Sequence, residues 1–153
     1  MTVLHDTFVI QRSYPASPAK VFRAWADPAV KARWFVGPDE WVAQPHTMDF
    51  RVGGTEGIAG GPAEGPVHRF AATYHEIVET ERIVSTYSMF MDDELMSVSL
   101  ATVELEPDGD GTLLTYTEHG AYLDDDPEAP ASRLEGTEGL LDQLGAVLTS
   151  VAA

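Results

Sequence analysis

The side chains of this sequence that could do chemistry are a glutamate and the tyrosines near it. Glu118 follows Leu114 and Tyr116 at a spacing of two, which places all three on one face of a β-strand. A carboxylate on an apolar face needs hydrogen-bond donors, a counter-charge or a bound proton, and its pKa can rise. Such a group orients a ligand or acts as a general base. The alternative is that the strand alternation slips at Gly120, which leaves Glu118 solvated at a strand end.

Aromatic side chains are the second candidate set, because tyrosine and tryptophan combine apolar bulk with one polar atom. They suit a packed core as well as the wall of a ligand pocket, and periodicity alone does not separate the two. Val21, Phe22 and Trp25 lie at helical spacing and are predicted to belong to the core. Asp49 and Arg51 share one face of an alternating segment, and we expect them to be structural and to pair across the sheet surface with Glu and Arg neighbours.

Several classes of chemistry have no support in the sequence. The five histidines lack the spacing of a metal site, and the acidic run Asp124–Asp126 lacks the pattern of a calcium loop. The glycines of segment 53–66 do not precede a Gly-Lys-Ser/Thr motif, so they form no phosphate loop. A nucleophile motif of the Gly-x-Ser-x-Gly type is absent. We therefore expect no metal, no cofactor and no assigned catalytic residue.

Length and charge narrow the choice of partner. The 153 residues predict one domain, residues 1–153, that is large enough to surround a pocket. Nine Lys and Arg against 25 Asp and Glu give a net charge of −16, which disfavours binding to nucleic acid and to anionic membranes. The absence of cysteine excludes disulfides and thiolate catalysis. Without a visible membrane span or secretion signal, we expect a cytoplasmic protein.

The elements that must position these residues begin with a strand at 7–14, which ends at Pro15. Ser17-Pro18 and Asp27-Pro28 each pair a capping side chain with a proline at the first helical position, so two short helices are expected. Gly37-Pro38 ends the second helix.

From residue 40 to residue 117 the apolar period is two, which predicts a mostly antiparallel sheet of six or seven strands. Alternation at 48–52 predicts one of these strands. The run Asp108-Gly109-Asp110-Gly111 predicts a tight hairpin between strands 96–106 and 112–119. We expect the glycine-rich segment 53–66 to be irregular, either as a mobile flap beside a pocket or as a surface loop.

The end of the chain predicts a long amphipathic helix at about 132–150. Its apolar stripe consists of Leu134, Leu141, Leu144, Leu148 and Val151.

Six segments, spread from the first predicted helix to the last, resemble one protein family. They are 17–28, 33–38, 49–54, 74–83, 111–115 and 135–144. In this order they resemble the START-like (SRPBCC) superfamily, and within it the proteins related to the C-terminal domain of the Hsp90 ATPase activator. Thr137 stands where many relatives carry tryptophan, and Glu118 stands where a histidine or another polar residue is common.

The resemblance implies an α+β architecture, the helix-grip fold. In this fold a curved antiparallel sheet wraps around a long C-terminal helix, with two short helices after the first strand, and a cavity lies between the sheet and the last helix. The side chains that it implies as ligand-binding are Trp34, Phe35, Trp41, Phe50, Tyr74, Tyr87, Met89, Tyr116, Glu118, Leu141 and Leu144.

Binding of a small, largely hydrophobic molecule without chemistry is the favoured function, because proton transfer needs a base with an orienting partner and the sequence offers one candidate group. The alternatives are an enzyme of the polyketide cyclase or aromatase kind and a chaperone-associated interaction protein. Strand 96–106 carries apolar residues on both faces, which favours a strand covered on both sides, for example by a homodimer partner.

Overall fold

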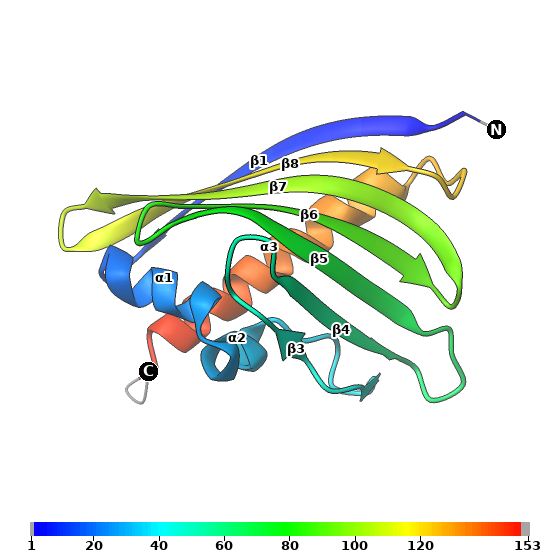
Figure 1. The fold of residues 1–153 in the computed structure, drawn as a ribbon, viewed down its shortest axis with the longest axis horizontal. Coiled ribbons are helices and arrows are strands. Elements are labelled where there is room, and N and C mark those ends of the chain that lie inside the picture. Colours follow the sequence, from blue (N-terminus) through cyan, green and yellow to red (C-terminus); the bar gives the residue numbers. More distant parts are fainter. Residues whose placement is uncertain (1, 151–153) are drawn as a thin grey trace.

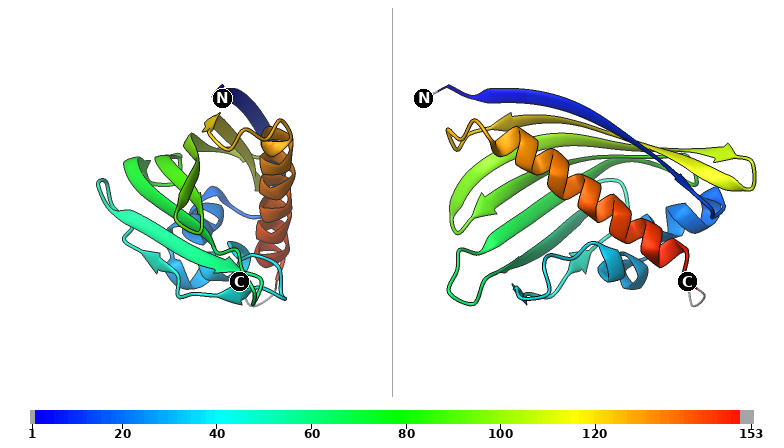
Figure 2. Two further views of the ribbon diagram at one scale, coloured as in Figure 1. Left: turned by 90° about the vertical axis from the view of Figure 1, so that its right-hand side faces the viewer. Right: turned by 180° about the vertical axis from the view of Figure 1, so that it is seen from behind.

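A curved antiparallel sheet wraps around a long helix in the computed structural model, which describes residues 2–150 (Figure 1). The helix, α3, crosses the concave face of the sheet diagonally, and two short helices lie near its C-terminal end (Figure 2). This is the predicted helix-grip arrangement. The elements in chain order are β1 Leu4–Tyr14, α1 Pro18–Ala26, α2 Pro28–Trp34, β2 Val42–Ala43, β3 Thr47–Met48, β4 Thr55–Gly61, β5 His68–Val78, β6 Arg82–Met91, β7 Glu94–Asp108, β8 Gly111–Tyr122 and α3 Ala129–Leu148.

Both short helices begin at the predicted caps. The Ser17 hydroxyl accepts a hydrogen bond from the Lys20 amide at 3.2 Å, and the Asp27 carboxylate accepts one from the Ala29 amide at 2.9 Å. In each case proline follows the cap, where its missing N–H costs nothing. The caps fix the turn between α1 and α2, so that Trp34 at the end of α2 is directed into the core.

The sheet follows the order β1-β8-β7-β6-β5-β4-β2, and β3 also pairs with β4. It has eight strands, one more than the largest number expected, because β4 forms in a segment that was expected to be irregular. The predicted hairpin is confirmed: Asp108 pairs with Gly111, and Gly109 adopts a positive φ of 59° that a tight turn of this kind requires.

The expectation of an irregular segment at 53–66 was wrong for its first half. Residues 55–61 form β4, which pairs with β5 on one side and with β2 and β3 on the other. The glycines there serve close backbone approach: a Cβ at Gly61 would lie 2.1 Å from the Pro66 carbonyl oxygen. Composition suggested flexibility, whereas the structure uses the same residues to bring two chain segments together.

The strand expected at 48–52 is also shorter than predicted. Only Thr47–Met48 pair with β4, and the chain then turns, with the Gly54 amide donating to the Arg51 carbonyl. The Arg51 side chain binds the Asp49 carboxylate at 2.8 Å inside this turn, so the two residues pair with each other and stabilise a turn rather than pairing with neighbours across a sheet face.

Helix α3 begins three residues earlier than expected and ends at Leu148. Its buried face consists of Thr137, Leu141, Leu144 and Leu148. Val151, the last residue of the predicted stripe, lies outside the described residues. The helix contacts α1, α2, β1 and β8, and this packing leaves the middle of the concave face free for a cavity.

The outer face of β7 carries the apolar residues that predicted a second covered face. Val98 and Leu100 point outward and are 41% and 40% exposed, while Ala101 and Val103 are buried on the inner face. A homodimer contact through this surface stays a prediction.

Candidate functional site

A cavity of about 750 Å³ lies between the concave face of the sheet and α3. Its volume falls within the range of ordinary small-molecule sites. Nine of the eleven side chains predicted to bind a ligand line its wall. These are Trp34, Phe35, Trp41, Phe50, Tyr74, Tyr87, Met89, Tyr116 and Leu141.

Two predicted side chains do not reach this wall. Leu144 is completely buried in the packing beneath α3, because the helix lies directly on its neighbours toward its C-terminal end. Glu118 is also completely buried, although the strand alternation is as predicted and Ala101 of β7 is its neighbour across the ladder. Hydroxyl groups from two tyrosines cover its carboxylate.

The Glu118 carboxylate sits in a polar cluster that closes one part of the cavity wall. Its Oε1 accepts hydrogen bonds from the hydroxyls of Tyr116 at 2.6 Å and Tyr87 at 2.8 Å. Its Oε2 faces an Nη atom of Arg133 at 3.3 Å. The Arg133 guanidinium also donates to the hydroxyls of Ser97 and Ser99, at 2.7 and 3.3 Å. The charge of Glu118 is therefore compensated inside the protein, and the tyrosine hydroxyls are held in fixed directions.

Arg133 was missed by the sequence analysis because a single arginine near the start of an amphipathic helix is usually solvated. It lies four residues before Thr137, a buried residue that lines the cavity and donates a hydrogen bond to the Arg133 carbonyl oxygen at 2.9 Å. The signal available in the sequence was this spacing of about one helical turn, which places Arg133 on the buried face of α3.

A second cluster surrounds Glu56 of β4, and the sequence analysis missed it. The Glu56 Oε1 accepts from the Lys31 ammonium and the Tyr74 hydroxyl, each at 2.6 Å. Its Oε2 lies 2.7 Å from Nε2 of His46. Lys31 and Glu56 are only 4% and 3% exposed, and both line the cavity. The signal available for Lys31 is its place three residues before Trp34, which puts it on the buried face of α2.

Burial and the charge of the partner shift the pKa values of Lys31 and Glu56 in opposite directions. Burial lowers the pKa of Lys31, although the Glu56 charge opposes the shift. Burial alone would raise the pKa of Glu56, but the Lys31 charge, with hydrogen bonds from Lys31, Tyr74 and His46, holds that pKa below its ordinary value. The carboxylate is thus charged at neutral pH and sits beside a cation in an apolar surrounding.

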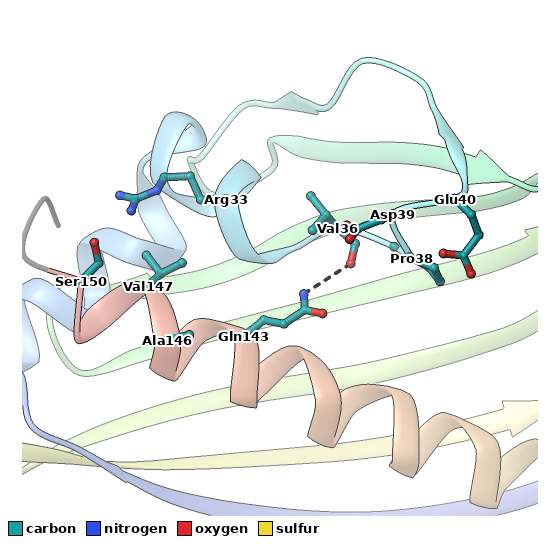
Figure 3. Close-up of a pocket in the computed structure, with 10 residues that line it drawn as sticks. Arg33, Val36, Pro38, Asp39, Glu40, Gln143, Ala146, Val147 and Ser150 are labelled. Atoms are coloured by element: carbon teal, nitrogen blue, oxygen red, sulfur yellow. Dashed lines mark hydrogen bonds between the residues drawn. The ribbon is translucent and has the colours of Figure 1, made fainter.

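A separate groove of about 500 Å³ lies outside the cavity, between the segment after α2 and the C-terminal half of α3 (Figure 3). Gln143 reaches from α3 across it and donates hydrogen bonds to the carbonyl oxygens of Trp34 at 2.6 Å and Val36 at 3.4 Å. Val36 and Gln143 line both the groove and the cavity, so this contact forms part of the wall between them.

Replacing Gln143 by alanine is expected to loosen segment 35–40. Loss of hydrogen bonds worth about 1 kcal/mol should raise local amide hydrogen exchange roughly fivefold. Asp142→Asn is the matched control, because Asp142 is exposed and faces Arg12 rather than this segment. Equal exchange in segment 35–40 of the two variants would contradict a role for Gln143 in holding the wall.

Burial raises the pKa of all five tyrosines, which are Tyr14, Tyr74, Tyr87, Tyr116 and Tyr122. A raised folded-state pKa means that the protonated hydroxyls stabilise the fold below the ordinary value of about 10 and that this contribution is lost as the pH rises further. We expect less tyrosinate absorbance near pH 10 than five ordinary tyrosines would give, with the remainder appearing together with alkaline unfolding. Ionisation of all five tyrosines near pH 10 in the folded protein, as judged by circular dichroism, would contradict the buried clusters.

Among residues 2–150 no helix is long and apolar enough to cross a membrane. The same part of the chain contains no group of three or more histidine, aspartate or glutamate side chains arranged to hold a metal ion.

Comparison of the sequence with known protein families gives evidence that is independent of the structure. The sequence model of the family described as "Activator of Hsp90 ATPase homolog 1-like protein" matches residues 15–149. The chain belongs to this family. The resemblance drawn from six sequence segments is thereby confirmed. A comparison with curated proteins finds no match.

Solved structures of bacterial members share the fold over nearly the whole chain. A protein from Rhizobium loti is 47% identical, with a TM-score of 0.88 over 96% of this chain and 99% of that chain. A protein from Rhizobium leguminosarum is 39% identical, with a TM-score of 0.90 over 96% of both chains. A protein from Chromobacterium violaceum is 32% identical, with a TM-score of 0.77 over 94% of this chain and 97% of that chain.

Proposed function

We propose that this protein binds a small, largely hydrophobic molecule in the cavity between the sheet and α3. The observation that carries the proposal is the cavity of about 750 Å³, whose wall is made mainly of aromatic and aliphatic side chains. A packed interior normally contains few voids larger than a water molecule, so a space of this size favours a role in ligand binding. The family and its START-like fold support a ligand-binding domain in general.

The two carboxylates of the polar clusters, Glu56 and Glu118, favour binding over catalysis. Glu118 is covered by Tyr87, Tyr116 and Arg133, and both oxygens of Glu56 already face donors from the protein. A general base must reach the proton that it removes. A cyclase-like reaction that used either of these two carboxylates would first have to displace one of the donors, whereas binding an apolar molecule requires no such change.

The test is a titration with Nile red, a neutral dye whose fluorescence rises in apolar surroundings. Ser85 lies on the inner face of β6, across the ladder from Tyr74 and Ala101, and lines the cavity. Ser85→Phe should fill part of the cavity and weaken dye binding at least tenfold. Ser88→Phe is the matched control, because it places the same side chain on the same strand, across the ladder from the outward-pointing Val98. Equal dye binding by the two variants would contradict the proposed site.

A further inference from the structure

The charged groups of the two polar clusters are paired with one another, while Asp124 and Asp126 add negative charge at another part of the cavity lining. Lys31 faces Glu56 at 2.6 Å, and Arg133 faces Glu118 at 3.3 Å. Each pair is neutral as a whole. An anionic ligand would add an uncompensated charge to an apolar space, and burying such a charge is costly. The part of the cavity beside the Lys31–Glu56 pair therefore favours an uncharged molecule.

The hydrogen-bond acceptors near Lys31 are occupied. The Glu56 Oε1 receives both the Lys31 ammonium and the Tyr74 hydroxyl, and its Oε2 faces His46. The Tyr74 hydroxyl hydrogen is directed at that carboxylate. A ligand with hydrogen-bond donors alone would therefore find the Glu56 acceptors beside Lys31 already occupied by groups of the protein.

The donors of Lys31 are not fully used. An ammonium carries three N–H bonds, and within residues 2–150 the Lys31 ammonium makes one hydrogen bond, to Glu56. Its nitrogen lies 5.5 Å from the ring centre of Trp25 and 4.7 Å from that of Phe35. Aromatic faces attract the charge but are weaker hydrogen-bond acceptors than oxygen. Lys31 lines the cavity, and its spare N–H groups are unused donors of this wall. Among the described residues the lining also contains Nε1 of Trp25, a buried donor, and Oδ1 of Asp124, a buried acceptor, each without a hydrogen-bond partner.

We propose that Lys31 anchors an uncharged, carbonyl-bearing apolar ligand by donating a hydrogen bond to the carbonyl oxygen. The inference rests on the proposed binding function and adds the chemical class of the ligand. Glu56 is a positioning residue here, because it holds the ammonium at the cavity wall while neutralising its charge.

Three probes of matched shape test the inference through displacement of Nile red. They are 2-acetylnaphthalene, 2-ethylnaphthalene and 2-naphthoate, which carry a ketone, a hydrocarbon group and a carboxylate on the same ring system. The ketone should bind about tenfold more tightly than the hydrocarbon, as one hydrogen bond from a charged donor allows, and the carboxylate should bind most weakly. The carbonyl stretch of the bound ketone should shift to lower wavenumber.

The double variant Lys31→Met/Glu56→Gln removes the ion pair without leaving a buried charge. It should keep the affinity for 2-ethylnaphthalene and lose the tenfold preference for the ketone. Lys20→Met/Glu64→Gln carries the same replacements outside the cavity and should keep that preference. The infrared shift in the parent protein tests the contact even where the double variant does not fold.

Three results would overturn the inference while the binding function stands: equal affinity of ketone and hydrocarbon, tightest binding by the carboxylate, or an unshifted carbonyl stretch. A ketone preference that survives in the double variant would also overturn it. Failure of all three probes and of Nile red to bind would contradict the binding function itself, and the inference would fall with it.

Discussion

Replacing Lys31 by methionine is expected to lower the free energy of unfolding by about 3–5 kcal/mol at pH 7. The variant leaves the Glu56 carboxylate, which is 3% exposed, without its cation. Tyr74 and His46 still face the carboxylate, but a hydroxyl carries no charge and an imidazole compensates the carboxylate only when it is protonated. Chemical denaturation monitored by circular dichroism measures the loss.

The effect should depend on pH and on the partner. In the parent protein the pKa of Glu56 lies below its ordinary value of about 4.3, so the ion pair stabilises the fold above that pH and the contribution fades as the pH falls. In Lys31→Met the lone carboxylate can take up a proton, and the difference from the parent should shrink toward pH 4. Adding Glu56→Gln should restore most of the stability at pH 7. A double variant as unstable as Lys31→Met would contradict this explanation, because it would show that the uncompensated Glu56 charge does not cause the loss.

Replacing Leu144 by aspartate should have an effect of similar or larger size. Leu144 is completely buried on the inner face of α3, so the variant loses apolar burial and places an unpaired charge in the core. The expected cost is about 4 kcal/mol or more, a large part of the roughly 5–15 kcal/mol that stabilises an ordinary domain. We expect a partly or fully unfolded protein in a thermal melt.

Ala146→Asp is the matched control for this variant, because it places the same charge two residues further along the same helix at an exposed position. It should cost about 1 kcal/mol or less. A melting curve of Leu144→Asp that coincides with that of Ala146→Asp would mean that the leucine face of α3 is solvated.

The parts of the fold that were predictable are those specified locally. Ser17 and Asp27 cap their helices through their own side chains, and the Asp108–Gly111 turn needs a residue that tolerates positive φ. The apolar period of α3 covers several turns, so its existence did not depend on one residue. In such cases the physical cause lies within a few residues of its effect.

The Lys31–Glu56 pair could not be predicted in this way. It joins α2 to β4, and β4 lies in a glycine-rich segment whose composition suggested a loop. The strand exists because glycine lets neighbouring backbones approach closely, a property of the tertiary fold. Once β4 was taken for a loop, its glutamate could not be assigned to the inner face of the sheet.

Glu118 shows the limit of strand alternation. The period of two identifies the inner face, but it does not say which side chain reaches the cavity and which is covered. Tyr87 comes from β6 and Arg133 from α3, and together with Tyr116 they separate the carboxylate from the cavity. The depth of a side chain depends on these partners, which are far away in sequence.

The central claim is that the cavity holds a small apolar molecule, and native mass spectrometry of protein purified from its own host tests it most directly. We predict a native mass above that of the 153-residue chain. Denaturation should release an uncharged organic molecule and leave the mass of the bare chain. Ser88→Phe should retain the added mass, and Ser85→Phe should lack it. A parent protein whose native and denatured masses both equal that of the bare chain, and which binds no Nile red, would contradict the account.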